Sequence, residues 1–202
     1  MSYVVKEESS FKQVAVGAYP ARCVRIIGLG TQHGEYEGKP TTRIQVLISW
    51  ELPGELIEEG EFAGQPYMVS KFYTQSLGEK ANLRKHLASW RGRDFTPEEL
   101  KGFDLTNIAG KVCMVSVIHN KKGKSTVDGV MALPKGMTVG PQVNPTVIFN
   151  IFQWDQAIFD TLTPGVQDMI KKSDEYQLMQ GGGYPVNEGQ ADNMPDSDSI
   201  PF

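Results

Sequence analysis

Residue types that bind phosphate groups are concentrated in one short stretch, Lys-Lys-Gly-Lys-Ser-Thr at residues 121–126. A nucleotide-binding P-loop needs another glycine five residues before the second glycine of its motif, and a helix after the loop. Position 118 is isoleucine, and strand-like sequence lies on both sides of the stretch. The spacing from Lys124 to Asp128 also differs by two residues from the Lys-x-Asp-Gly motif of nucleotidyl transferases. The stretch therefore does not predict nucleotide chemistry.

Side chains for metal binding or acid–base catalysis are scattered along the sequence. The three histidines, His33, His86 and His119, fall in different predicted elements and have no acidic partner at ligand spacing. Cys23 and Cys113 form no Cys-x-x-Cys pair, and no Gly-x-Ser-x-Gly motif occurs. We therefore predict a protein that is not an enzyme, with no metal and no cofactor. We expect both thiols to be reduced and buried in strands rather than to serve redox chemistry or crosslinking.

Charge is distributed unevenly along the 202 residues. Six of the 24 acidic residues lie from Asp174 onward, where there is no Lys or Arg, so 20 basic residues face 18 acidic ones before that point. A hydrophobic content of 40% suffices for one domain of ordinary size. No apolar run approaches the length of a membrane helix, and the first residues lack a signal-peptide layout. We expect a cytoplasmic protein without membrane contact, made of a mildly positive body and an acidic arm.

Hydrophobic periodicity predicts strands in most of the body. In segment 42–52, apolar residues from Ile44 to Leu52 alternate with polar residues that include Arg43 and Glu51, which predicts one buried and one exposed face. Trp50 lies on the apolar face and is expected in the core. Further strands are predicted at 19–29, 66–75, 111–120 and 126–134, with a glycine-bearing connector at 30–40.

A helix is predicted between the third and fourth strands. Leu83, Leu87 and Trp90 fall on one helical face of segment 79–90, so Trp90 is also expected in the core. A second short helix should begin at Thr96, with a capping box. Three strands, a helix and two strands predict a mostly-β protein with a five-stranded OB-fold barrel. Another small α+β domain is the alternative.

The sequence divides into three parts by composition. Residues 1–144 are predicted to form the OB-fold, and residues 145–172 a short helical extension packed on the barrel, with helices at 155–162 and 164–172. Residues 173–202 have the glycine, proline and polar content of a flexible acidic tail. The residues expected to pack the extension on the barrel are Ile158, Phe159, Leu162, Val166 and Ile170.

The predicted barrel places several basic and aromatic residues on one surface. OB-folds bind nucleic acid on the face of strands two and three and on the loops joining strands one to two and four to five. Cations there can contact phosphates, and aromatic rings can stack on bases. Along strand three, alternation should turn Tyr67, Lys71 and Tyr73 to this surface and Met68 and Phe72 to the core. The predicted residues for binding single-stranded DNA are Tyr36, Arg43, Tyr67, Lys71, Tyr73, Lys121, Lys122 and Lys124.

The last residues are suited to docking into a partner protein. Asp196 and Asp198 precede Ile200, Pro201 and Phe202. A partner could bury the phenyl ring, bind the terminal carboxylate with a basic residue and face the aspartates with a basic rim.

This ending resembles the acidic tip of bacterial single-stranded DNA-binding proteins, although serines at 197 and 199 interrupt the acidic run. The body, including segments 148–162 and 164–177, is similar to phage-encoded single-stranded DNA-binding proteins with an OB-fold. The resemblance implies a phage replication or recombination protein in the host cytoplasm. It would protect single strands and recruit host or phage replication, recombination and repair proteins through its tip.

Several alternatives stay open at this stage. The chain could be an interaction protein that is not an enzyme, whose tail mimics the host tip and diverts host enzymes. The lysines of 121–124 could form a merely solvated turn, and the tail could fold back on the basic face and compete with DNA. The sequence leaves open whether the protein forms homo-oligomers and whether it prefers DNA to RNA.

Overall fold

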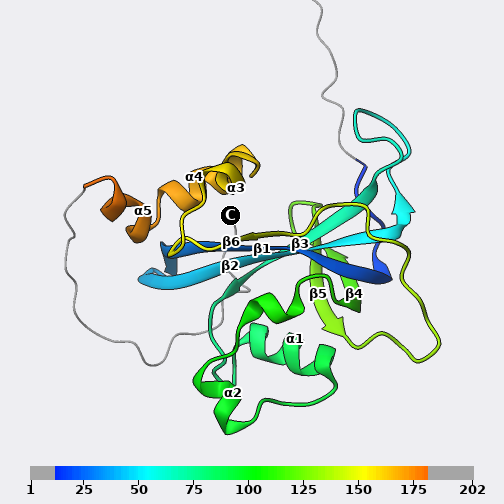
Figure 1. Cartoon of the computed structure of the whole chain (residues 1–202), viewed down its shortest axis with the longest axis horizontal. Coiled ribbons are helices and arrows are strands. Elements are labelled where there is room, and N and C mark those ends of the chain that lie inside the picture. Colours follow the sequence, from blue (N-terminus) through cyan, green and yellow to red (C-terminus); the bar gives the residue numbers. More distant parts are fainter. Residues whose placement is uncertain (1–11, 182–202) are drawn as a thin grey trace, which may run out of the picture.

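The computed structural model describes residues 12–181. Five strands occupy residues 17–131 and are interrupted by a helical segment, and a short strand and further helices follow (Figure 1). The strands are β1 (Gly17–Tyr36), β2 (Lys39–Leu56), β3 (Pro66–Thr74), β4 (Val112–His119), β5 (Ser125–Met131) and β6 (Val147–Phe149). The helices are α1 (Asn82–Arg91), α2 (Pro97–Lys101), the 3-10 helix η1 (Leu105–Ile108), α3 (Gln156–Asp160), α4 (Pro164–Lys171) and α5 (Asp174–Met179).

The strands form one sheet. Five of them lie in the order β3-β2-β1-β4-β5 with antiparallel neighbours, and β6 pairs in parallel with β1. This confirms the predicted mostly-β class and the predicted succession of three strands, a helix and two strands. Strand β6 was not predicted, because a three-residue strand is too short to show a periodicity.

The β1–β2 hairpin is much longer than predicted. Residues 30–40 were expected to be a connector, but pairing continues to Tyr36 opposite Lys39. The turn between them has positive φ at Glu37 (49°) and Gly38 (75°), as a two-residue turn matched to the twist of the strands requires. The glycines that suggested a loop instead permit a turn and a register shift between Gly28 and Gly30.

The inner core lies between the sheet and α1 (Figure 1). Trp50 is 1% exposed, and α1 contributes Leu83 and Leu87, as predicted. Trp90 is half-buried against this core, and its Nε1 donates to the carbonyl of Val112 at 2.8 Å. The apolar face of α1 therefore fixes the helix beneath the sheet.

Both cysteines lie in this core as free thiols, Cys23 in β1 and Cys113 in β4. Burial raises the pKa of Cys23 to about 12 and also raises that of Cys113. These thiols are protonated at neutral pH, so they act as small apolar core residues.

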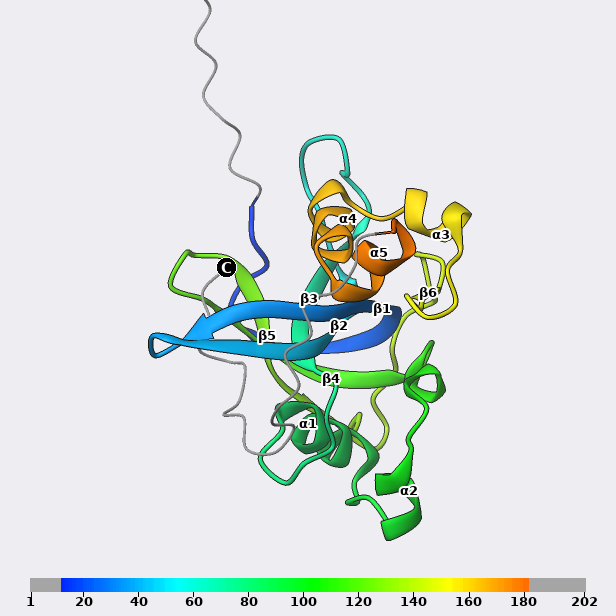
Figure 2. The same ribbon diagram turned by 90° about the vertical axis from the view of Figure 1, so that its left-hand side faces the viewer.

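An outer core lies on the opposite side of β1 and β2, under the C-terminal helices (Figure 2). Ile27, Leu29 and Leu47 of the sheet meet Phe149 and Ile151 there. The helical extension packs on the sheet, and the five residues predicted to pack it on the barrel all take part in this core: Ile158, Phe159, Leu162, Val166 and Ile170.

The two cores bury both faces of β2, so the prediction of an exposed face was wrong. Arg43 is 4% exposed, and Glu51 is not exposed at all. Glu51 accepts hydrogen bonds from the backbone amides of Val143 (3.1 Å) and Asn144 (2.8 Å). The segment between β5 and β6 therefore crosses the face of β2 that was expected to be exposed. Glu51 accepts hydrogen bonds from two backbone amides of that segment.

The structure also corrects the boundary of the predicted tail. Residues 174–179 form α5, capped by the Ser173 hydroxyl, which accepts from the amide of Tyr176. The Tyr176 ring lies 5.5 Å from Trp154 and 6.5 Å from Phe159, between centroids. Through this aromatic contact, α5 packs against the outer core, which the polar composition of the segment did not indicate.

Candidate nucleic-acid interface

The β4–β5 turn presents lysines to solvent. Lys121, Lys122 and Lys124 are all exposed. The Asn120 side chain accepts from the amides of Lys122 and Lys124, both at 3.0 Å, and Gly123 has a φ of 73°. The side chain of Asn120 and the backbone therefore close a turn on which all three lysines are exposed.

Residues before β1 brace this turn. His119 Nε2 lies 2.8 Å from the carbonyl oxygen of Val14, and the Ser125 hydroxyl donates to the same oxygen at 3.1 Å. The Ser125 amide donates to Gln13 Oε1 at 2.9 Å. Both ends of the turn are therefore hydrogen-bonded to residues 13–14, which fixes the position of the turn that carries the lysines.

The tip of the β1–β2 hairpin projects on the same side of the molecule as the β4–β5 turn, to the left in Figure 2. Tyr36 is half-buried there, and Lys39, its partner across the turn, is exposed. Both residues lie in the presumed connector, where Tyr36 was predicted as a binding residue and Lys39 was not. A Glu-Gly turn flanked by pairable residues was the signal that could have identified it.

The structure partly contradicts the expectation for β3. Tyr67, Lys71 and Tyr73 share a side as predicted, but that side faces the inner core: Tyr73 is 2% exposed and Tyr67 is half-buried against the cluster. The Tyr73 hydroxyl lies 2.8 Å from His86 Nδ1 on α1. Phe72 faces the outer core instead. Tyr73 is thus a core residue, because α1 covers the side that was expected to bind bases.

The other two predicted cations, Lys71 and Arg43, lie on strands and are less exposed than the turn lysines. Lys71 is half-buried, with Nζ 6.0 Å from the centroid of the Tyr73 ring. Arg43 is buried on the side of β2 that the outer core covers, which corrects the expectation of an exposed guanidinium. The exposed positive charge therefore lies at the loops more than on the strands.

Ion pairs neutralise several other cations. Arg84 pairs with Asp94 (2.8 Å), and both Arg91 and Arg93 pair with Glu99. The hydrogen bond from Arg93, followed by that from the Thr96 amide, lowers the pKa of Glu99 to about 2. Thr96 and Glu99 also form the predicted capping box. By contrast Lys39, Lys121 and Lys124 form no ion pair with another residue of the described range 12–181.

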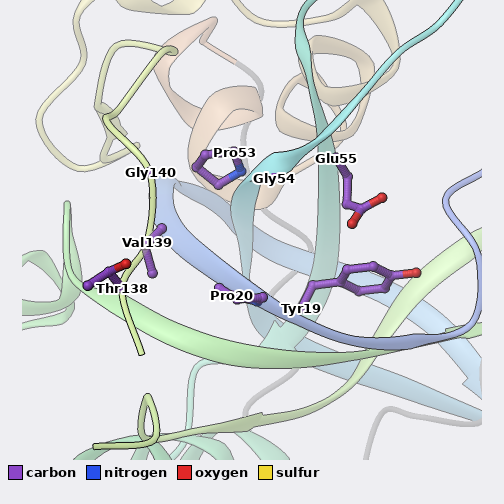
Figure 3. Close-up of a pocket in the computed structure, with 8 residues that line it drawn as sticks. All are labelled: Tyr19, Pro20, Pro53, Gly54, Glu55, Thr138, Val139 and Gly140. Atoms are coloured by element: carbon purple, nitrogen blue, oxygen red, sulfur yellow. The ribbon is translucent and has the colours of Figure 1, made fainter. Parts of the chain in front are cut away.

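A small hollow lies between β1, the end of β2 and the segment that follows β5 (Figure 3). Its volume is about 90 Å³, well below the roughly 300 Å³ at which pockets for small molecules begin. Its lining residues are Tyr19, Pro20, Pro53, Gly54, Glu55, Thr138, Val139 and Gly140. The hollow does not itself indicate a substrate site.

Each of the three histidines is engaged. His33 contacts Asp174 and Thr42, His86 contacts Tyr73, and His119 contacts Val14. Within residues 12–181, no group of three or more His, Cys, Asp or Glu could hold a metal ion. None of the helices in that range is long and apolar enough to cross a membrane.

No protein-family model matches the chain, and no curated protein matches it. The residues predicted for partner binding, Asp196, Asp198, Ile200, Pro201 and Phe202, lie outside the described residues.

Proposed function

We propose that the sheet is an OB-fold and that the protein binds single-stranded DNA without strong sequence preference. One observation carries the proposal: the strand order β3-β2-β1-β4-β5, with the β1–β2 tip and the lysine-bearing β4–β5 turn on one side of the molecule. These are the two loops by which OB-folds bind oligonucleotides.

In this proposal, phosphate contacts supply most of the affinity. Lys121, Lys122 and Lys124 follow the backbone at one end of the site, and Lys39 contacts it at the other. Tyr36 and Tyr67, both half-buried, keep part of each ring for stacking on bases. Stacking contributes about 1–3 kcal/mol per base and tolerates any base. Lys71, which is half-buried on β3, adds a further cation.

The tail adds recruitment to this function. Asp196, Asp198 and the Ile-Pro-Phe end dock into replication, recombination or repair proteins, as the resemblance to phage and bacterial single-stranded DNA-binding proteins implies. Such a protein acts in the host cytoplasm during phage DNA replication. The acidic tail also competes with DNA for the basic surface, so that removing 182–202 tightens binding at low salt.

Replacing the three turn lysines tests the DNA-binding surface. We expect Lys121→Ala/Lys122→Ala/Lys124→Ala to weaken binding of a labelled oligo-dT. The salt slope should fall by about 0.7 for each phosphate that the variant no longer neutralises. Fluorescence anisotropy titrations from low to moderate salt measure both quantities.

The matched control is Lys101→Ala/Lys111→Ala/Lys135→Ala, which removes the same charge from three exposed lysines outside the two loops. Equal reductions of affinity in both triple variants would show that net charge, and not this surface, governs binding.

One observation favours a second candidate function. The burial of Tyr73 and Arg43 removes two of the predicted base and phosphate contacts. An interaction protein that uses its tail to divert host enzymes would need neither residue. Tyr36→Ala and Tyr67→Ala distinguish the candidates, since a single-strand binder loses affinity for oligo-dT in both variants.

A further inference from the structure

Two carboxylates of α5 are bound by neighbouring residues of β1. Glu175 Oε2 accepts from the backbone amide of Thr31 and Oε1 accepts from its hydroxyl, both at 2.7 Å. Asp174 Oδ1 lies 2.7 Å from His33 Nε2. A backbone amide, a hydroxyl and an imidazole of one hairpin edge therefore hold two anionic groups.

The hairpin is shaped for an anion at this point. Gly30 has a φ of 74°, and a Cβ on it would lie 2.5 Å from Glu175 Oε2. Only glycine lets a charged oxygen approach the backbone this closely. Thr42 Oγ1, 3.1 Å from His33 Nδ1, orients the imidazole toward Asp174. Backbone amides, hydroxyls and imidazole N–H groups can also donate hydrogen bonds to phosphates of nucleic acid.

Helix α5 itself is held lightly. None of its residues is buried, and Leu178 and Met179 are 41% and 47% exposed. Apart from the two carboxylates, its main attachment is the packing of Tyr176 against Trp154 and Phe159. Releasing α5 would leave most of the outer core in place, because all of the buried residues of that core lie outside α5.

We propose that Gly30, Thr31 and His33 form a phosphate site that α5 occupies with its own carboxylates, and that single-stranded DNA displaces them. The inference rests on the proposed function. The site lies on the hairpin whose tip carries Tyr36 and Lys39, and α5 lies over the same hairpin (Figure 1). DNA that reaches the tip therefore meets Asp174 and Glu175, which repel its phosphates and compete for the same donors.

Neutralising the two carboxylates tests this competition. Asp174→Asn/Glu175→Gln should tighten binding of oligo-dT by about fivefold or more, the usual lower range for coupling between two ligands. The control Asp160→Asn/Asp168→Asn removes the same charge from exposed positions of α3 and α4 that do not contact the hairpin. An equal gain in both variants, or no gain in the first, would overturn the proposal.

Removing the donors in the same background gives a second check. Thr31→Val/His33→Ala, added to Asp174→Asn/Glu175→Gln, should cancel the gain, because DNA then lacks the donors that the carboxylates released. A gain that persists without these donors would contradict a phosphate site at this place. Thermal unfolding of each variant establishes that the fold is retained.

Hydrogen exchange of the unchanged protein separates this proposal from the proposed function. With saturating oligo-dT, amides of α5 should lose protection while those of α4 keep it. Unchanged protection of α5 in a protein that binds the oligonucleotide would refute the displacement alone. Absence of binding to the oligonucleotide would instead refute the proposed function.

Discussion

At the scale of single residues, Glu99 shows that some charged side chains of this protein are paired within the fold. It binds Arg91 and Arg93, while Arg91 also lies 4.5 Å from the Phe95 ring centroid and 5.1 Å from that of Phe103. These arginines connect the end of α1 to the segment around α2, so they are committed to the fold. By contrast, Lys121 and Lys124 of the β4–β5 turn are exposed and form no ion pair within residues 12–181.

This arrangement predicts a pH-dependent contribution to stability. The pKa of Glu99 is lowered from 4.5 to about 2 in the folded protein, so its ionised form stabilises the fold above about pH 4.5, and this contribution is lost as the pH falls toward 2. Glu99→Gln should lower Tm at pH 7, and its difference from the unchanged protein should shrink between pH 4.5 and 2. The neighbouring exposed Glu98→Gln is the control, and a difference in Tm that does not vary with pH would contradict the account.

Residue roles were predictable where one contact decides them. The capping box at Thr96 and the burial of Trp50 follow from local pattern and hydrophobicity. The burial of Tyr73 and Arg43 was not predictable, because it depends on how other elements pack against the two faces of the sheet. Alternation along β3 predicted that Tyr67 and Tyr73 lie on the same side of the strand. It could not predict that this side faces the inner core, because that depends on the position of α1.

At the scale of elements, the β1–β2 hairpin joins the sheet, the candidate DNA site and α5. Its pairing extends from the sheet to the turn at Glu37 and Gly38, and its register shift places Gly30 against Glu175. Glycines at 30 and 38 have nearly the same φ, 74° and 75°, but differ in surroundings: nothing lies within 4 Å of a Cβ added at Gly38.

Alanine substitutions at these two glycines distinguish the cost of backbone strain from the cost of disturbing the contact with α5. Gly38→Ala should cost about 1–2 kcal/mol, the penalty of a left-handed conformation alone. Gly30→Ala should cost more, because its methyl group would also meet Glu175 Oε2 at 2.5 Å and Ser173 Cβ at 2.8 Å. Urea denaturation measures both, and equal costs would show that α5 does not depend on close approach to Gly30.

The lengths of elements were less predictable than their existence. The five longer strands, the central helix and the helices of the extension were all expected. The hairpin end was not, since glycines typical of a connector also permit a two-residue turn. Helix α5 was missed because its stability comes from Tyr176 packing on Trp154, an interaction that no periodicity in a six-residue segment can indicate.

At the scale of the whole molecule, one sheet carries two cores, and the outer one leaves little of the β2 face open. The C-terminal extension therefore covers much of this face, whereas Lys39 at the hairpin tip and the lysines of the β4–β5 turn stay exposed. The mostly-β class was predictable from alternation, whereas the coverage of both faces of β2 was not, because polar residues such as Glu51 are buried there by hydrogen bonds to the segment between β5 and β6.

The most direct test of the central claim is an anisotropy titration of the unchanged protein with oligo-dT and with a duplex of equal length, across a range of salt. The account predicts tight binding to the single strand, weakened by salt with a slope of roughly 0.7 per phosphate contact, and much weaker binding to the duplex. Equal affinity for the two nucleic acids, or no binding of the single strand at low salt, would contradict it.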